Sequence, residues 1–458
     1  MPKYLDELSE FVEQTKYDDL KPEALAAVKD VTLDTLGVMV AGSGQSENAS
    51  LGKLVAERSN SDKATIFGLR LKAEPMMATL VNATAGVCLE MDEGNNLGGG
   101  HPAIHVIPGA IAVAEEMGAS GRQLIESIIV GYEVGSRIGG AAKLRTGTNL
   151  ETGKRWDVHP HGPYGTISTA VAVAKLKGYS SNQVTGAMNL AASMSPANTW
   201  TPCFEGATVR NLFSGRSGLQ GILAVHVYEC GYTGLEDGPT DILGSILGEQ
   251  FDRDAVVEGL REGEYRIQKN YLKFHACCRI NHPTLDAVFE AVTGAEFALD
   301  DVEAVEINTP TMHPDMMGAY PENMLSAKFN VPYAVAAAIV RNRTDVTSFF
   351  PEAISDGRIR NLAGKVNIQV NPEESKTSVY STLATAFIRL KDGRSLEGNT
   401  TIVRGDYGNR VLKEELVDKF HFLTDEIIGP KRAESIVNAV NSLEQIADIR
   451  ELSALFND

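Results

Sequence analysis

The sequence predicts a mainly α-helical protein with two domains, a large helical domain and a smaller inserted α+β domain. Three observations lead to this fold class. The chain has 458 residues, which is more than one hydrophobic core usually holds. Apolar residues recur at three- and four-residue spacing up to about residue 265, and again from residue 412. Between these parts, several short runs alternate apolar and polar residues, as strands do.

The helical pattern is clearest in the first part of the chain. The helices expected there span residues 25–39, 78–89, 103–116, 124–138, 165–177, 183–193 and 215–229. Several are apolar on nearly every side, so we expect them to lie inside a helical bundle. Their small residues would allow neighbouring helices to approach closely.

The pattern changes after residue 265. We expect strands at residues 302–309, 366–370 and 385–390, a possible fourth strand at 400–403, and a buried helix at 331–341. Helices return at residues 413–420, 430–442 and in the last turns to 456.

These elements group into two expected domains. Residues 1–266 and 408–458 would form the all-helical domain, which is discontinuous in sequence, and residues 267–407 would form the inserted α+β lid domain. A cleft between two such domains is the usual place for a ligand.

Composition narrows the class of protein. The chain has 42 basic and 60 acidic residues, a formal charge of −18, which argues against nucleic acid or an anionic membrane as partner. No apolar run reaches the roughly 18 residues of a membrane span, and the first residues lack a signal-peptide pattern. The five cysteines are odd in number and scattered, as expected of reduced thiols in a cytoplasmic protein.

The most informative segment is residues 273–282, Lys-Phe-His-Ala-Cys-Cys-Arg-Ile-Asn-His. Burying unpaired charge is costly, so Lys273, His275 and Arg279 together favour a site for a small anion. The adjacent Cys277 and Cys278 could pair or bind a soft metal, but small buried residues are the favoured interpretation.

Three other segments contain candidate residues. One is the acidic, glycine-rich loop before the 103–116 helix, one opens the 165–177 helix, and one precedes the 215–229 helix. The candidates in them are Asp92, Glu93, Asn96, His101, His159, His161 and Arg210. The N-terminus of a helix favours anions, and an arginine can clamp a carboxylate with two hydrogen bonds. The acidic loop alone is as often structural as functional, and Arg210 alone would more often be an ordinary loop residue, so the prediction depends on the convergence of these residues.

Metal and nucleotide sites are not predicted. His101 and His105 are four residues apart, and His159 and His161 are two apart, but no HExxH or CxxC pattern accompanies them. We therefore favour proton transfer over metal binding. The sequence has no P-loop, no strand–GxGxxG–helix unit and no GxSxG motif, so no nucleotide cofactor is expected.

Taken together, these motifs resemble those of the MmgE/PrpD family over nearly the whole chain. The resemblance is carried by an ordered series of short motifs. They are the helix beginning Val31-Thr-Leu-Asp-Thr-Leu-Gly, the acidic loop ending in His101-Pro, His159-Pro-x-Gly-x-x-Gly-Thr, Arg210-Asn-Leu, Lys273-x-x-x-Cys-Cys-x-x-x-His-Pro and Ala327-Lys-Phe.

The resemblance implies a helical domain with a smaller α+β lid, a homodimer, and an active site between the domains that uses no metal or organic cofactor. By motif, it points to Asp92 and its neighbours, His101, His159, Arg210 and Lys273.

The sequence also departs from the family pattern. The acidic motif reads Glu90-Met-Asp-Glu-Gly instead of Asp-x-Asp-Asp-Thr. Arg210 replaces a loop lysine, and Phe213 replaces a histidine. Because an arginine stays charged, it cannot shuttle a proton, so we expect the substrate to differ from those of better-known members.

The expected function is a cofactor-independent lyase that dehydrates a small di- or tricarboxylate, similar to 2-methylcitrate dehydratase. His101 and His159 would transfer protons, with the base and the acid left unassigned between them. Asp92 would orient a histidine or accept a proton itself, and Lys273 and Arg210 would hold carboxylates and stabilise developing charge. The remaining substrate-binding candidates are Glu93, Asn96, His161, His275 and Arg279. Epimerisation and decarboxylation are the alternative reactions. A protein that only binds a carboxylate, or serves as an assembly subunit, is the alternative of another class.

Overall fold

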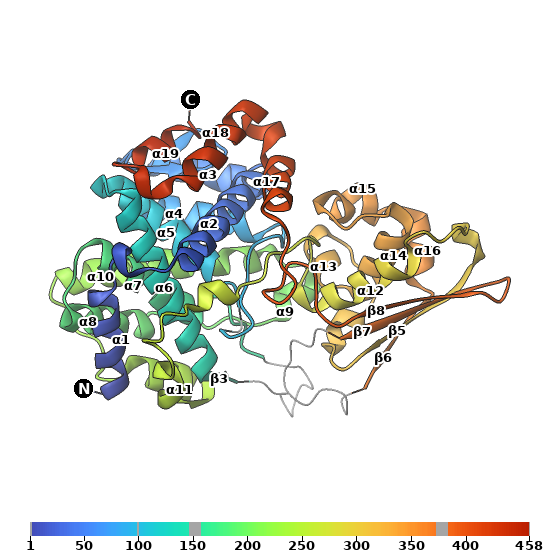
Figure 1. Cartoon of the computed structure of the whole chain (residues 1–458), viewed down its shortest axis with the longest axis horizontal. Helices are drawn as coiled ribbons and strands as arrows, with labels where there is room; N and C mark the ends of the chain where they lie inside the picture. Colours follow the sequence, from blue (N-terminus) through green and yellow to red (C-terminus); the bar gives the residue numbers. More distant parts are fainter. Residues whose placement is uncertain (1, 99, 146–156, 372–382, 458) are drawn as a thin grey trace.

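The computed structural model describes residues 2–98, 100–145, 157–371 and 383–457. It contains a large helical bundle and a smaller unit built on a sheet, with both chain ends on the bundle (Figure 1). The predicted mainly α-helical class is confirmed.

The bundle contains most of the helices. They are α1 (Lys3–Gln14), α2 (Pro22–Ser43), α3 (Ser46–Arg58), α4 (Pro75–Val87), α5 (Pro102–Met117), α6 (Gly121–Ala141), α7 (Pro163–Leu176), α8 (Ser181–Ser193), α9 (Thr201–Glu205), α10 (Leu212–Glu229) and α11 (Arg253–Val257). Short strands accompany them as two antiparallel pairs: β1 (Ala64–Ile66) with β2 (Leu71–Ala73), and β3 (Ala142–Leu144) with β4 (Gly248–Phe251).

Small residues explain how the central helices pack. Helices α5, α6 and α7 are buried over almost their whole length. A Cβ atom on Gly135 of α6 would lie only 1.7 Å from the Ser168 hydroxyl oxygen of α7. These two helices can therefore approach this closely only because the position is a glycine.

The smaller unit, which we call the α+β unit, covers residues 282–400. Its elements are α12 (His282–Val292), β5 (Val302–Thr309), α13 (Met324–Lys328), α14 (Val331–Arg341), α15 (Pro351–Ile354), α16 (Gly357–Ala363), β6 (Val366–Val370), β7 (Ala384–Leu390) and β8 (Ser395–Thr400). The strand order is β6-β5-β7-β8, with β5 and β6 parallel and the other pairs antiparallel.

The fourth strand lies earlier than predicted. We expected it at residues 400–403, but β8 ends at Thr400. It follows β7 through a tight Asp392-Gly393 turn, in which Gly393 has a φ of 92°. Gly398 interrupts the apolar alternation of β8 because α12 packs against it: a Cβ there would lie 2.1 Å from the Ala287 carbonyl oxygen.

The last helices return to the bundle. They are α17 (Lys413–Ile428), α18 (Pro430–Asn441) and α19 (Arg450–Ala454). Phe420 of α17 and Val437 of α18 belong to the same hydrophobic core as most helices of the first part. The α+β unit forms a second core, to which Val38 of α2 and Leu423 of α17 also contribute. Figure 1 shows α17 beside α2. The domain boundaries at 266/267 and 407/408 remain predictions.

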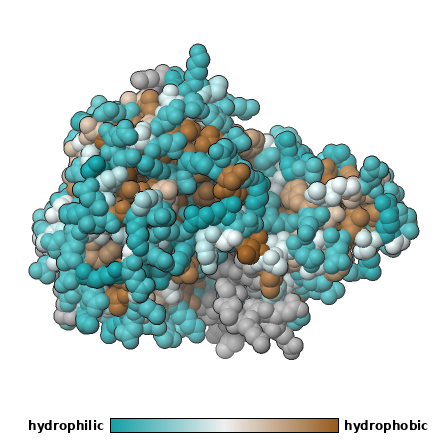
Figure 2. Space-filling view, viewed as in Figure 1, coloured by the Kyte–Doolittle hydropathy of each residue, from teal (hydrophilic) through white to brown (hydrophobic). Residues whose placement is uncertain are grey.

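The surface of the molecule is largely polar. The face drawn in Figure 2 is mainly hydrophilic, with separate apolar patches over the bundle. Within the described ranges, no helix is both long and apolar enough to cross a membrane.

Candidate active site

Helices α5 and α7 each begin at a proline, which suits the first position of a helix because its missing N–H is not needed there. His101 directly precedes α5. The loop 159–162 directly precedes α7, and Gly162 has a φ of 111° that a residue with a side chain would adopt only under strain. The chain thus brings three predicted histidines to neighbouring helix ends.

The acidic turn after α4 lies against these histidines. Glu90 and Asp92 are both buried. Glu90 bridges two buried cations, the Arg210 guanidinium and the Lys273 ammonium, the latter at 2.9 Å. Lys273 Nζ also lies 3.5 Å from Asp92 Oδ1. Four groups that are up to 183 residues apart therefore form one compact ionic network.

The network determines the charges of its members. Burial would raise the pKa of Glu90, but Arg210 and Lys273 outweigh burial and hold that pKa below its ordinary value. For Asp92, burial is likewise outweighed, here by His101 and Lys273, so its pKa is also lowered. Both carboxyl groups are thus ionised at neutral pH.

The turn itself is held in an unusual backbone conformation. Glu90 has a φ of 54°, in the left-handed region that residues with side chains rarely adopt. Lys419 and Asp34 of the bundle hold this turn in place. Lys419 of α17 donates to the Met91 carbonyl oxygen at 2.8 Å, and its charge is balanced by the buried carboxylate of Asp34 on α2 at 2.5 Å.

The hydrogen bonds of His101 indicate its tautomer. Its Nδ1 lies 2.7 Å from the Glu93 carbonyl oxygen and 3.0 Å from Asp92 Oδ2. Because both neighbours are acceptors, Nδ1 carries a proton, and Nε2 is the atom that can exchange one. An imidazole oriented by a carboxylate in this way is suited to act as a general base.

His159 is arranged differently. Its Nδ1 accepts the backbone N–H of His161 at 3.0 Å, which leaves Nε2–H as a donor with no partner among the described residues. The centroid of its ring lies 4.1 Å from that of Trp200 and 5.7 Å from that of Phe213. Burial holds the pKa of His159 well below its ordinary value, with Arg210 adding to the effect. A neutral ring of this kind donates a hydrogen bond better than it accepts a proton.

His161 lies at the centre of the imidazoles. Its ring centroid is 4.6 Å from that of His101, 5.0 Å from His159 and 5.3 Å from His105. Neither ring nitrogen has a hydrogen-bond partner in the part of the chain that the structure describes. Burial keeps the pKa of His161 well below its ordinary value, and the neighbouring Arg210 adds to the effect.

A metal ion is a second possible occupant of this cluster. Asp92, His101 and His161 can each direct one ligand atom so that the three lie within 4.8 Å of one another. However, Asp92 already contacts Lys273, and Arg210 is close by, so a divalent ion would meet two buried positive charges. The charges of the site suit a small anion better than a metal cation.

Glu93 and Asn96 have different surroundings from the residues above. Glu93 accepts the Tyr132 hydroxyl and the Ala103 N–H, and burial raises its pKa to about 8. Its carboxylate therefore binds the first turn of α5 through the Ala103 N–H and does not take part in the ionic network. Asn96 is half-buried, while the neighbouring Asn95 organises the loop by accepting two backbone N–H groups and donating to the Arg266 carbonyl oxygen.

His275 and Arg279 were predicted to bind substrate, but both are engaged elsewhere. The two ring nitrogens of His275 bind Thr344 and Asp286, at 2.5 and 2.8 Å. Arg279 pairs with Asp406 at 2.7 Å. These side chains secure the start of the α+β unit, so we leave them out of the candidate site.

Sequence reasoning missed three groups that belong to the cluster or border it. Glu90 was noted only as a departure from a motif, although it is the residue that joins both cations. His105, whose Nδ1 lies 2.7 Å from the Ser217 hydroxyl oxygen, was signalled by its four-residue spacing from His101. Lys328 of α13 reaches the Cys88 carbonyl oxygen at 2.8 Å, and burial lowers its pKa to about 8. It belongs to the Ala327-Lys-Phe motif, but that motif did not indicate that its ammonium group borders the cluster.

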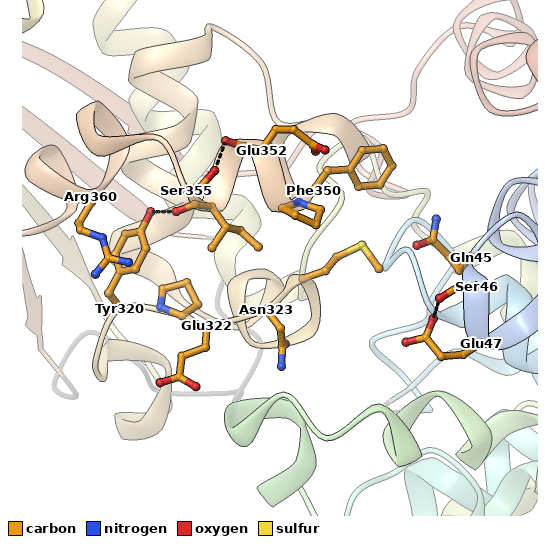
Figure 3. A pocket seen from close by; sticks show the side chains of 14 residues that line it. Gln45, Ser46, Glu47, Tyr320, Glu322, Asn323, Phe350, Glu352, Ser355 and Arg360 are labelled. Atoms are coloured by element: carbon orange, nitrogen blue, oxygen red, sulfur yellow. Dashed lines mark hydrogen bonds between the residues drawn. The ribbon is translucent and has the colours of Figure 1, made fainter.

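The cavities near the interface differ in position. One of about 520 Å³ adjoins the histidines through Trp200 and Pro160. Another, of about 860 Å³, lies at the start of α3 and the α13–α15 face of the α+β unit (Figure 3). Its lining includes Glu47, Glu322 and Arg360 but none of the histidines or cations of the ionic network.

Two models of one protein family match most of the chain. The model of the MmgE/PrpD N-terminal domain matches residues 6–243, and that of the MmgE/PrpD C-terminal domain matches residues 275–445. A cis-aconitate decarboxylase-like protein, oryM, of Aspergillus oryzae is 23% identical, and the match covers 98% of this chain and 96% of that protein.

Further relatives have similar identities. The cis-aconitate decarboxylase of Aspergillus terreus is 23% identical, over 96% of this chain and 93% of its own. The cis-aconitate decarboxylase of Mus musculus is 24% identical, over 96% and 90%.

Proposed function

The chain belongs to the MmgE/PrpD family, and from this premise we propose that it is a lyase acting on a small carboxylic acid. The reaction would begin or end with proton transfer at the carbon next to a carboxylate. One observation carries the proposal: a carboxylate-oriented imidazole, His101, lies within the same buried cluster as two cations, Arg210 and Lys273.

Dehydration is the reaction that we propose first, because one oriented imidazole can both remove a proton and return it to a leaving group. His101 Nε2 would take the proton α to the carboxylate, and Asp92 would balance the resulting imidazolium. The same imidazolium would then give the proton to the departing hydroxyl, so that water leaves and a double bond forms. His159 Nε2–H would donate a hydrogen bond to the substrate during this transfer.

Arg210 and Lys273 would stabilise the negative charge that builds up on the substrate carboxylate as the C–H bond breaks. Glu90 already neutralises part of their charge. The substrate would therefore share these cations with Glu90, and an acid with few carboxylates would be held better than a highly charged one.

Decarboxylation is a second candidate because the relatives described above are named as cis-aconitate decarboxylases. Loss of carbon dioxide also needs a proton donor, since a carbanion must be protonated where the carboxylate leaves. His101 as an imidazolium could supply that proton.

Product analysis tests the proposal. The full chain would be incubated in deuterated water with hydroxy-di- and tricarboxylates, including 2-methylcitrate, and with cis-aconitate, and followed by NMR. We expect loss of water from a hydroxy acid. Loss of carbon dioxide would replace dehydration by decarboxylation, and deuterium exchange with inversion would indicate an epimerase.

Two variants make the assay specific. His101→Asn should reduce turnover by about 10²- to 10⁴-fold, the usual value of a well-placed proton-transfer group. His421→Asn, at a partly exposed histidine on α17, should retain activity. Absence of turnover on every acid, together with thermal stabilisation by some of them, would favour a carboxylate-binding protein instead.

A further inference from the structure

The cavity of about 520 Å³ lies between the bundle and the α+β unit. Gly139 of α6 and Leu144 of β3 line it from the bundle. Met312 and Met316 of the α+β unit line it from the other side, so the cavity is formed where the two parts of the molecule meet. A space of this size is typical of sites for small organic ligands.

Its inner wall is shared with the candidate active site. Trp200 lines the cavity and packs 4.1 Å from the His159 ring. Pro160, between His159 and His161 in sequence, lines the cavity as well. Tyr164, another lining residue, lies 5.9 Å from the His105 ring. A ligand that reached the histidines from this cavity would still have part of its length inside it.

The chemistry of the lining differs from that of the ionic network. Aromatic and aliphatic side chains dominate it, and the described lining residues include no lysine or arginine. Asp157 is the one lining residue among them with a formal charge, and His313 lies 3.5 Å from its carboxylate. A second carboxylate placed here would lose hydration and face Asp157, both of which are unfavourable.

The ionic network therefore suits a charged end of a ligand, and the cavity suits an uncharged end. We propose that the substrate carries its carboxylate at one end and an uncharged apolar tail of several carbon atoms at the other, with the tail in this cavity. The proposal rests on the function proposed above and narrows its substrate class. It separates this chain from an enzyme for a compact tricarboxylate, whose charges would occupy both regions.

A homologous series of unreactive acids tests this. Binding of succinate, 2-propylsuccinate and 2-hexylsuccinate to the full chain would be measured by calorimetry, with citrate for comparison. Each buried methylene should tighten binding by about fourfold until the cavity is filled. Citrate should bind more weakly than the hexyl compound.

Two filling variants show where the tail lies. Ala142→Phe narrows the cavity from the bundle, and Thr311→Phe narrows it from the other side. Both positions are half-buried, which favours folding of the variants. Each variant should bind succinate with unchanged affinity. Its affinity should no longer increase as the alkyl tail of the ligand is lengthened.

The outcomes distinguish this proposal from the one on which it rests. Succinate binding without any gain along the series, or citrate binding tightest, would overturn the apolar tail and leave the carboxylate lyase in place. A gain that persists in both filling variants would place the tail elsewhere. Failure of every acid to bind would overturn both proposals.

Discussion

Glu90→Gln should destabilise the protein by about 3–5 kcal/mol at pH 7, because it removes one partner from a buried ion network. The side chains of Glu90, Arg210 and Lys273 are 1%, 2% and 0% exposed. Lys273 would keep Asp92 as a partner at 3.5 Å. Arg210 would keep a long contact of 3.4 Å to the Val87 carbonyl oxygen and its position over the Phe329 ring, but it would lose the carboxylate paired with it, so most of the loss should come from this arginine.

Glu93→Gln is the matched control, because Glu93 is equally buried and three residues away, and its carboxylate accepts hydrogen bonds from the Tyr132 hydroxyl and the Ala103 N–H. The two free energies of unfolding would be measured from urea titrations followed by circular dichroism. Glu93→Gln should be neutral or stabilising at pH 7, since burial already raises the pKa of Glu93 to about 8. Equal losses in the two variants would refute the reasoning that pairing with Arg210 and Lys273 makes Glu90 different.

Three further predictions follow from the same contacts. Asp92→Asn should lower turnover by about 10²- to 10⁴-fold with little change in substrate binding, and full turnover would show that the carboxylate does not orient the base. Lys419→Met should cost about 3–5 kcal/mol and also lower activity, whereas Lys413→Met, at a partly exposed pair, should cost at most about 1 kcal/mol in the same urea assay. The pKa of Glu93 is raised, so its contribution to stability is full below about pH 4.5 and is lost as pH rises through about 8. The stability gap between Glu93→Gln and the unmodified chain should therefore widen from pH 6 to pH 9, and a constant gap would mean that Glu93 is ionised throughout.

The fold was largely predictable because its signals are local. The apolar spacing of α6 and α7 reflects burial that any helix of that pattern would need. Strand β8 was predicted at the wrong position because a glycine weakens its local pattern. Gly398 removes one apolar position, and its role is visible only when α12 lies against it. The Asp392-Gly393 turn was present in the sequence and would have placed β8 correctly had it been given more weight than the apolar run after residue 400.

The candidate site was predictable only in part. The order of the motifs pointed to the MmgE/PrpD family, and that membership is confirmed. Spacing alone could not separate Lys273 from His275. They are two residues apart, yet one joins Glu90 and the other turns to Asp286. Their partners lie on distant segments, so only the tertiary structure decides which side chain faces the cluster.

The contact between Lys419 and the Met91 carbonyl oxygen has a consequence for synthesis of the protein. A ribosome adds residues in order, and early parts of a chain begin to fold before later parts emerge. Every acid, base and cation of the ionic network has left the ribosome long before α17 has. The nascent chain therefore has a complete set of reactive groups but an unsupported turn, and a product terminated before residue 413 should be inert even though it keeps all of them.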